Sequence, residues 1–259
     1  SRSRPASPVS IDPHFRVEVL ARTEHPQTLC WWAMHQDYSE NFVFDEEPPS
    51  ESDAGRLIIK HLLAGERGHY GPLEHAQIVL NVGWFPHSVM QQARTHRVGV
   101  SFDVQSMRYT GDRICRAANG ELDLEEVFYL RPVGQYSDRQ GKKYSYSAEQ
   151  RGEDLELCRR AAARYRDMLA AGFAEEHARG ILPFDYRQHF VVSFSLRAFL
   201  HFMDLRAKLD ARHILQAHRR PIRVRAQHDI AELRGRGELA LNRDRGAHQL
   251  RGQGRLFAQ

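Results

Sequence analysis

The sequence predicts an α+β fold, and three of its features lead to that prediction. Residues 15–21 and 77–84 alternate apolar and polar side chains, the period of a strand with one buried face. Two long segments, 148–174 and 186–208, carry apolar residues at helical spacing and predict helices. Strands and helices are interspersed without regular β-α-β spacing, which favours α+β over α/β. With 259 residues, 41% of them hydrophobic, the chain can bury a substantial core.

Local signals predict a helix between the two alternating strands. Residues 45–53 are a polar, proline-containing loop in which Ser50 or Ser52 can cap a helix. Apolar residues then recur at helical spacing until Gly65 and Gly68 end the segment.

Shorter elements follow in the middle of the chain. Pro86 suits the first turn of a helix that runs to about His96, and an extended segment follows it. Residues 127–130 resemble a short strand, whereas the polar run 137–147 predicts an exposed loop. Pro183 separates the two long helices.

Charge divides the chain into two parts. Residues 211–259 contain eleven arginines and four acids, a net charge of +7, whereas the first 210 residues carry −3. Apolar periodicity also ends there, and Phe257 is the last part's single aromatic residue. We expect residues 1–216 to form the folded domain and residues 217–259 to be a poorly packed basic tail.

Cysteine usage and hydropathy indicate a compartment. The three cysteines are widely spaced and form no C-x-x-C pair, which is typical of a reducing cytosol. No apolar stretch approaches the roughly 18 residues that would span a bilayer. The sequence therefore predicts a cytoplasmic location and no membrane contact.

Residues 91–109 are the most informative part of the chain. Three arginines, a histidine and several small polar residues stand at the end of the predicted helix and in the extended segment after it. Guanidinium groups bind phosphate through paired hydrogen bonds, so this pattern indicates an anion site, such as one for a nucleotide. A solvated, salt-bridged helix end explains the same pattern equally well.

Five histidines raise the question of a metal site; they are His61, His69, His75, His87 and His96. Their spacings match neither H-E-x-x-H nor a pair four residues apart on one helix. The sequence predicts no metal.

The second long helix combines apolar and charged residues. It is apolar on nearly every side, so burial of Arg197, His201, Asp204 and Arg206 costs several kcal/mol per ion unless each has a partner. These side chains either form an internal Arg–Asp network or face a ligand cavity.

Three collinear motifs resemble the flavin-dependent thymidylate synthases. The first motif resembles a variant of the family signature and consists of Arg-Thr-His-Arg at 94–97 and Ser-Phe-Asp-Val-Gln-Ser-Met-Arg-Tyr at 101–109. It departs from the signature in three ways: Thr95 stands at the first Arg position, the spacer has eight residues, and Val104 stands where an acid is usual. His-Tyr-Gly-Pro-Leu-Glu-His at 69–75 is similar to a flavin-contacting segment, with Gly71 in place of Thr. Residues 195–206 resemble a third motif, with Ser195 and His201 where Asn is usual.

The resemblance implies a fold and a reaction. The fold is a single domain with a mixed sheet and long helices, and residues 1–216 would be its catalytic, flavin- and dUMP-binding domain. The reaction is the reductive methylation of dUMP to dTMP, with FAD as cofactor, and NADPH and methylenetetrahydrofolate as co-substrates. The family forms homotetramers, with sites built from several subunits.

The resemblance also implies site residues, position by position. Arg206 contacts the uracil and favours its ionised form, which makes it the catalytic candidate. The expected dUMP-binding residues are Gln92, Gln105, Ser106, Met107, Arg108, Arg179 and Arg206, with Arg108 and Arg179 as the phosphate partners. The expected FAD-binding residues are Gly71, Glu74, Thr95, His96, Arg97, Ser195, Arg197 and His201.

Two other classes of protein compete with this interpretation. The basic tail suits an α+β protein that binds RNA or DNA, although it lacks the interleaved aromatic residues of single-strand binders. A metal-dependent hydrolase has only the histidine count in its favour.

Overall fold

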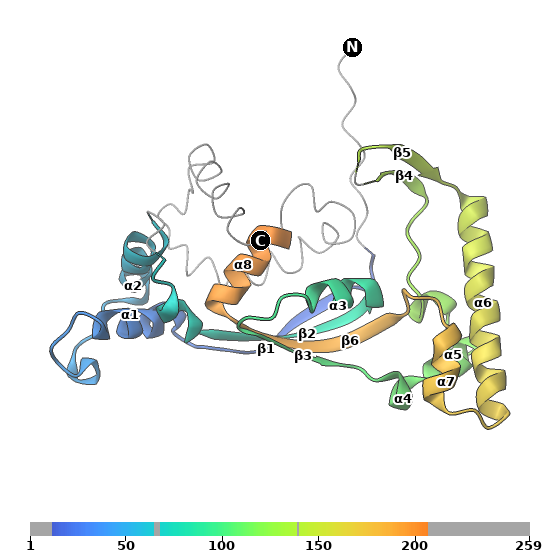
Figure 1. Cartoon of the computed structure of the whole chain (residues 1–259), viewed down its shortest axis with the longest axis horizontal. Coiled ribbons are helices and arrows are strands. Elements are labelled where there is room, and N and C mark those ends of the chain that lie inside the picture. The colour runs from blue at the N-terminus through green and yellow to red at the C-terminus, as the bar shows by residue number, and fades with distance from the viewer. Residues whose placement is uncertain (1–11, 65–67, 139, 207–259) are drawn as a thin grey trace, which may run out of the picture. The chain divides into compact units, whose positions relative to one another are not determined.

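The computed structural model describes residues 12–64, 68–138 and 140–206 (Figure 1). The α+β fold class is confirmed. The described residues belong to two compact units. Of the described residues, the sheet unit contains those within 12–22, 78–194 and 198–206, and the helical unit contains those within 23–77 and 195–197. No helix in the described ranges is both long and apolar enough to cross a bilayer. The predicted tail, 217–259, lies outside the described residues.

The sheet unit is built on four strands in the order β1 (Arg16–Arg22), β2 (Gln77–Pro86), β6 (Arg187–Ser195) and β3 (Val100–Val104). β1 pairs antiparallel with β2, with Val17 opposite Val82. β3 pairs antiparallel with β6, with Phe102 opposite Val192. Both strands predicted from alternation, and the extended segment after residue 96, are confirmed.

The long helix predicted over 186–208 is wrong in its first half. The chain forms strand β6 up to Ser195, and only then helix α8 (Leu196–Arg206). β6 lies between β2 and β3, and six of its nine residues are buried. A strand covered on both faces is a nearly continuous apolar run, which periodicity cannot distinguish from a buried helix.

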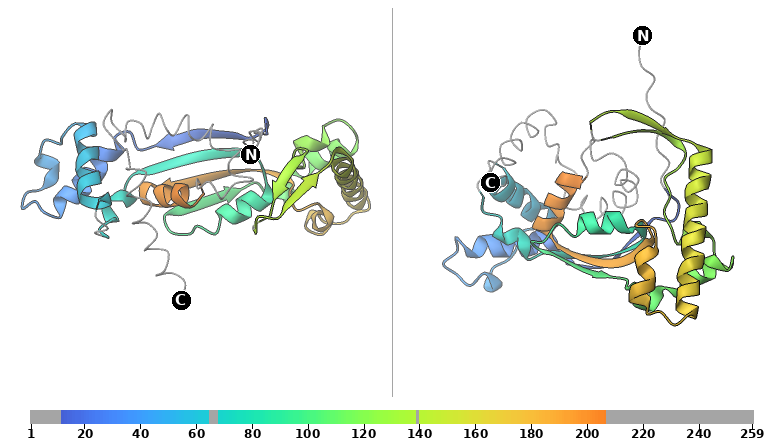
Figure 2. Two further views of the ribbon diagram at one scale, coloured as in Figure 1. Left: turned by 90° about the horizontal axis from the view of Figure 1, so that it is seen from above. Right: turned by 45° about the vertical axis from the view of Figure 1, so that its right-hand side comes forward.

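Helices α3 (His87–Ala93) and α8 lie over the same face of the sheet (Figures 1 and 2). α3 ends three residues earlier than predicted, and Pro86 is its N-cap rather than part of its first turn. Of the side chains expected to be buried on α8, Arg197, His201 and Asp204 are exposed, and Arg206 is half-buried. The expected burial of these four groups is therefore wrong, since α8 buries only a narrow face with Ala198 and Phe199.

A second set of helices in the sheet unit packs along α6 (Ala148–Ala170), with α5 (Asp112–Ala118) and α7 (Glu175–Ala178) beside it (Figure 1). α6 starts with a reciprocal capping box between Ser147 and Gln150 and ends close to the predicted position. Its core residues Ala162 and Tyr165 are fully buried. Gly111 is required here, because a Cβ at this position would lie 2.0 Å from the Tyr165 hydroxyl oxygen.

The run 137–147, expected to be a loop, contains most of a hairpin. Strands β4 (Gly134–Ser137) and β5 (Lys143–Tyr146) pair antiparallel, and the Asp138 carboxylate accepts hydrogen bonds from the turn amides of Gln140 and Lys142. Residues 127–130 form no full strand; Phe128 makes a single bridge to Tyr186.

The helical unit contains α1 (Pro26–Gln36), which the sequence analysis missed, and α2 (Glu51–Ile58), packed together (Figure 1). Ser50, one of the two predicted caps, caps α2, and a π-helical segment (Ile59–Leu63) extends it. The Glu51 carboxylate accepts hydrogen bonds from the first backbone amides of α1, at Gln27 and Thr28. These amides have no partner within their own helix, so a distant side chain fixes where α1 begins.

Four 3₁₀ segments and the short helix α4 complete the described chain. The 3₁₀ segments are Val43–Asp45, Gly71–Glu74, Leu124–Glu126 and Arg179–Ile181, and α4 is Met107–Thr110.

Candidate functional site

A cluster at the end of α3 joins three of the predicted site residues in the sheet unit. The Arg206 guanidinium donates from Nε to His96 Nε2 at 3.1 Å and from Nη2 to the Gln92 carbonyl at 3.3 Å. The His96 ring also meets the Phe202 ring edge-on, with centroids 5.0 Å apart. The structure thus brings together Arg206, expected on the uracil, with Gln92 and His96.

Electrostatics in this cluster keep the histidine uncharged. Burial lowers the pKa of His96, and the positive charge of Arg206 and the neighbouring His201 lower it further. The neutral ring can then accept the Arg206 hydrogen bond, which a protonated ring could not. Burial also lowers the pKa of Arg206, which nevertheless stays charged, as arginine does in proteins.

Thr95 and Arg97 flank His96 and are exposed. The Thr95 hydroxyl donates to the Gln92 carbonyl at 2.8 Å, which closes the end of α3. Within the described residues Arg97 has no ion-pair partner, so its guanidinium is available to an anion.

The predicted phosphate partners lie on elements that pack together. Arg108, on α4, is exposed and pairs with Glu176 of α7 at 2.6 Å. Arg179 directly follows α7 and is also exposed, and α4 contacts α7. Ser106 caps α4, while the Met107 side chain is buried, so a ligand could meet Met107 only through its backbone.

Gln105 is held by neighbours that the sequence analysis did not select. Its backbone amide donates to the His189 carbonyl at 2.9 Å, and its side-chain oxygen accepts from the His189 amide at 3.3 Å. The Gln188 side chain donates to the Gln105 carbonyl at 3.2 Å and lies 2.6 Å from His87 Nδ1. The polar run 187–189 at the start of an apolar segment was the available signal for these residues.

His189 supports a strained residue of β2. Its Nδ1 accepts a hydrogen bond from the Trp84 amide at 3.3 Å, and Trp84 has φ of 61°, in the left-handed region that a bulky residue rarely adopts. Burial lowers the pKa of His189, and the positive charge of Arg113 lowers it further. The folded protein therefore favours the neutral ring that this hydrogen bond requires.

We expect the protein to lose stability as the pH falls below about 6.5, the ordinary pKa of histidine. Below about pH 6.5 the unfolded chain binds a proton at His189, whereas the folded chain binds one only at lower pH. The stability that neutral His189 contributes is therefore fully present above about pH 6.5 and is lost as the pH falls through the pKa of the folded state. Thermal unfolding midpoints between about pH 5 and pH 7.5 measure the effect. His189→Asn should flatten this dependence of the unfolding midpoint on pH, whereas His177→Gln, at an exposed position of α7, should leave it unchanged. If the unaltered protein and both variants show the same dependence on pH, His189 is not its source.

The helical unit holds four of the residues expected to bind FAD. Glu74 and Arg197 form an ion pair at 2.5 Å, and the Arg197 guanidinium lies 5.7 Å from the centre of the Tyr70 ring. Gly71 opens the 3₁₀ segment, and a Cβ there would meet nothing within 4 Å, so the Thr usual in the resembled motif would fit. Ser195 is buried at the end of β6. The third motif therefore starts in a strand, not in a helix.

Among the described residues, no group of three or more His, Cys, Asp or Glu side chains is arranged to hold a metal ion.

Comparison with known proteins identifies the family. The family described as thymidylate synthase complementing protein matches residues 18–222. A flavin-dependent thymidylate synthase of Haloarcula marismortui is 35% identical over 211 residues, which cover 75% of this chain and 83% of that protein. The chain belongs to the flavin-dependent thymidylate synthase family. Another family member, from Halobacterium salinarum, is 32% identical over 76% of this chain and 84% of its own length.

Solved structures agree with this family in fold. Thymidylate synthase X from Helicobacter pylori, solved with FAD and dUMP, has a TM-score of 0.60 at 16% identity and covers 80% of this chain and 91% of its own. The UMP/dUMP methylase PolB from Streptomyces cacaoi, solved with 5-Br dUMP, has a TM-score of 0.55 at 18% identity and covers 75% of this chain and 79% of its own. The family and the fold expected from the three motifs are confirmed, whereas the roles of individual residues stay predictions.

Proposed function

We propose that this member of the flavin-dependent thymidylate synthase family converts dUMP to dTMP, with FAD as cofactor and with NADPH and methylenetetrahydrofolate as co-substrates. The observation that carries the proposal is the Arg206–His96–Gln92 cluster, which holds a charged guanidinium beside the signature segment. When bound, FAD would supply the redox chemistry of the reaction. The chain's own residues bind and orient the pyrimidine and stabilise charge on it.

Arg206 is proposed as the residue that acts on the uracil. A guanidinium has five N–H donors, and the contacts to His96 and Gln92 use two of them. The remaining donors can meet a carbonyl oxygen and a deprotonated ring nitrogen in one plane. A fixed positive charge there favours the ionised pyrimidine and stabilises negative charge that develops on it.

The remaining dUMP contacts are proposed for Gln92, Gln105, Ser106, Met107, Arg108 and Arg179. Arg108 and Arg179 supply exposed positive charge on adjoining elements, which suits a phosphate dianion. Because Glu176 already neutralises Arg108, phosphate binding must compete with or displace that ion pair.

FAD contacts are proposed for Thr95, His96, Arg97 and His201 of the sheet unit and for Gly71, Glu74, Ser195 and Arg197 of the helical unit. The donor set suits the cofactor, since exposed Arg97 has no ion-pair partner in the described ranges and can meet a diphosphate. The open space at Gly71 leaves backbone accessible to a ligand.

Deoxyuridine should bind about ten- to a hundredfold more weakly than dUMP, because a lost charge-assisted partner weakens binding by roughly 1.5–3 kcal/mol. Arg108→Ala and Arg179→Ala should each reduce the difference in affinity between deoxyuridine and dUMP. Arg159→Ala is the matched control, because Arg159 is equally exposed and pairs with Glu156 on α6. Calorimetric titration measures the affinities, and equal binding of nucleoside and nucleotide to the unaltered protein would remove both arginines from the phosphate site.

Purified protein tests the whole proposal. It should be yellow, with flavin absorbance, and should form dTMP from dUMP when both co-substrates are supplied. A colourless protein that cannot be reconstituted with FAD contradicts the proposal and favours the alternative of a basic-tailed nucleic-acid-binding protein. Light scattering tests the proposed homotetramer, and fractionation tests the proposed cytoplasmic location.

A further inference from the structure

A buried glutamine of β6 supports one of the residues proposed to bind dUMP. The Gln188 side chain is 3% exposed and donates from Nε2 to the Gln105 carbonyl at 3.2 Å. Gln188 lies outside the three motifs that indicated the family. A buried amide is stable only when its donors and acceptor are satisfied, so its partners show what it holds in place.

Hydrogen bonds fix which way the Gln188 amide faces. The Gln105 carbonyl can only accept, so it must meet the NH₂ group, which also lies 3.4 Å from the Tyr186 hydroxyl. The Gln188 oxygen then faces His87 Nδ1 at 2.6 Å, and this nitrogen carries the proton. The other ring nitrogen of His87 accepts from Gln91 Nε2 at 2.8 Å. In this arrangement the His87 ring is neutral, has one defined tautomer and holds Gln188 in place.

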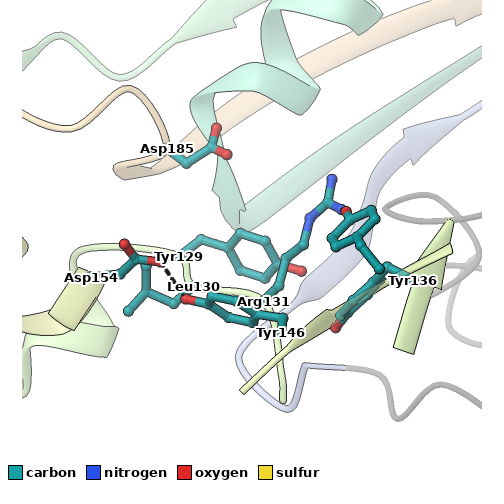
Figure 3. Close-up of a pocket in the computed structure, with 8 residues that line it drawn as sticks. Tyr129, Leu130, Arg131, Tyr136, Tyr146, Asp154 and Asp185 are labelled. Carbon is teal, nitrogen blue, oxygen red and sulfur yellow. Dashed lines mark hydrogen bonds between the residues drawn. The ribbon is translucent and has the colours of Figure 1, made fainter. Parts of the chain in front are cut away.

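Further contacts join the start of α3 to the segment before β6. The His87 amide donates to the Tyr186 carbonyl at 3.0 Å, and the two rings stack with centroids 4.8 Å apart. The Asp185 carboxylate, labelled in Figure 3, accepts a hydrogen bond from the Ser88 amide at 3.1 Å. The two elements therefore stay together when the His87 or the Gln188 side chain is replaced.

The Gln105 side chain offers a ligand hydrogen-bond donors only. Its oxygen accepts from the His189 amide at 3.3 Å, and a backbone amide can only donate, so the oxygen must face it. The NH₂ group of Gln105 has no partner in the described part of the chain. Ser106 and Arg108 follow within three residues, and Arg108 is a proposed phosphate partner. The acceptor expected beside Gln105 is therefore a phosphate oxygen.

We propose that Gln188, held by His87, is a positioning residue for the nucleotide phosphate. It fixes Gln105 so that the NH₂ group of Gln105 donates to a phosphate oxygen, and it does not touch the nucleotide itself. The inference rests on the proposed function, because it takes dUMP as the ligand. A side chain that presents only donors suits a phosphate dianion, which only accepts.

Substitution of Gln105 tests which side of its amide meets the nucleotide. The full-length protein with FAD bound is titrated calorimetrically with dUMP and with deoxyuridine. Gln105→Ala should weaken dUMP about tenfold and leave deoxyuridine nearly unchanged. Gln105→Glu should weaken dUMP further, because it keeps an oxygen for the His189 amide and turns a negative oxygen toward the phosphate. Full dUMP affinity in Gln105→Glu, or an equal loss for both ligands, overturns the proposal.

Substitution of Gln188 and His87 tests the positioning role. Gln188→Met keeps the volume without polar atoms and should weaken dUMP about tenfold, with deoxyuridine affinity and flavin content unchanged. His87→Leu should have the same effect. His87→Asn should restore most of the affinity, because its amide nitrogen can replace Nδ1 as the donor to Gln188. Gln135→Met, at an exposed position of β4, is the matched control.

Combined substitutions separate positioning from a structural role. Gln188→Met should weaken dUMP by less than about twofold in the Gln105→Ala background, because residues that act through one another are not additive. Additive losses, or unchanged dUMP affinity in folded Gln188→Met or His87→Leu, overturn the inference. Flavin content and the unfolding midpoint report folding, and the His87 variants carry the test if Gln188→Met does not fold. Failure of the unaltered FAD-bound protein to bind dUMP would instead overturn the proposed function, and this inference with it.

Discussion

Arg206→Ala is expected to abolish dTMP formation while FAD stays bound. The proposed work of Arg206 is on the pyrimidine, where a fixed planar cation stabilises charge that develops during the reaction, and loss of one such group typically lowers kcat by about a hundred- to a thousandfold. Arg206→Lys should rescue poorly, because a point charge on a flexible stem cannot make the fork of contacts that reaches His96 and Gln92. Flavin absorbance and dTMP formation measure the two effects.

A second measurement separates this role from a structural one. The positive charge of Arg206 contributes to the lowered pKa of His96, after burial, so Arg206→Ala should raise that pKa toward the ordinary value. Arg206→Lys should leave it low. Arg164→Ala, at an exposed position of α6, is the control for both measurements. Near-normal turnover in Arg206→Ala or Arg206→Lys would remove Arg206 from the catalytic role.

Arg187→Met is expected to give the largest loss of stability. The Arg187 side chain is 1% exposed and donates to Asp12 at 2.7 Å, to the Glu125 carbonyl at 2.6 Å and to the Trp84 carbonyl at 2.9 Å. Its removal leaves a carboxylate and two part-buried carbonyls without their donor. Breaking a buried pair by removing one partner destabilises by about 3–5 kcal/mol.

Urea unfolding at fixed protein concentration measures this loss. Arg187→Lys should recover only part of it, since one ammonium cannot reach three acceptors in the directions that a guanidinium serves. Arg164→Met, at an exposed position of α6, should change stability by less than about 0.5 kcal/mol. A similar midpoint for Arg187→Met and Arg164→Met would show that the buried network does not stabilise the fold.

Asp12 provides a further check on that network. Burial by itself would raise the pKa of Asp12, but hydrogen bonds from Arg187 and from the His14 amide outweigh it and lower the pKa below 3.8. The stability that Asp12 contributes is therefore full above that pH and lost as the pH falls through its folded pKa.

Several elements could be predicted from the sequence because their signals are local. Alternation in β1 and β2 reports one buried face, Ser50 caps α2 through its own side chain, and α6 has both an apolar stripe and its capping residues within the segment. The three motifs that indicated the family are likewise continuous stretches of chain. These features need no knowledge of what packs against them.

Only the tertiary structure decided the features that depend on distant partners. Residues 187–195 form a strand because β2 and β3 cover their edges, whereas their composition suits a buried helix as well. α1 begins where Glu51 meets its first amides, and Arg187 is buried because Asp12, Trp84 and Glu125 supply acceptors from three other segments. The sequence by itself determined the family and the α+β class, and it predicted the residue types of the candidate site. The contact between Arg206 and His96, 110 positions apart, was decided by the fold, because hydrogen bonding and burial depend on neighbours in space rather than along the chain.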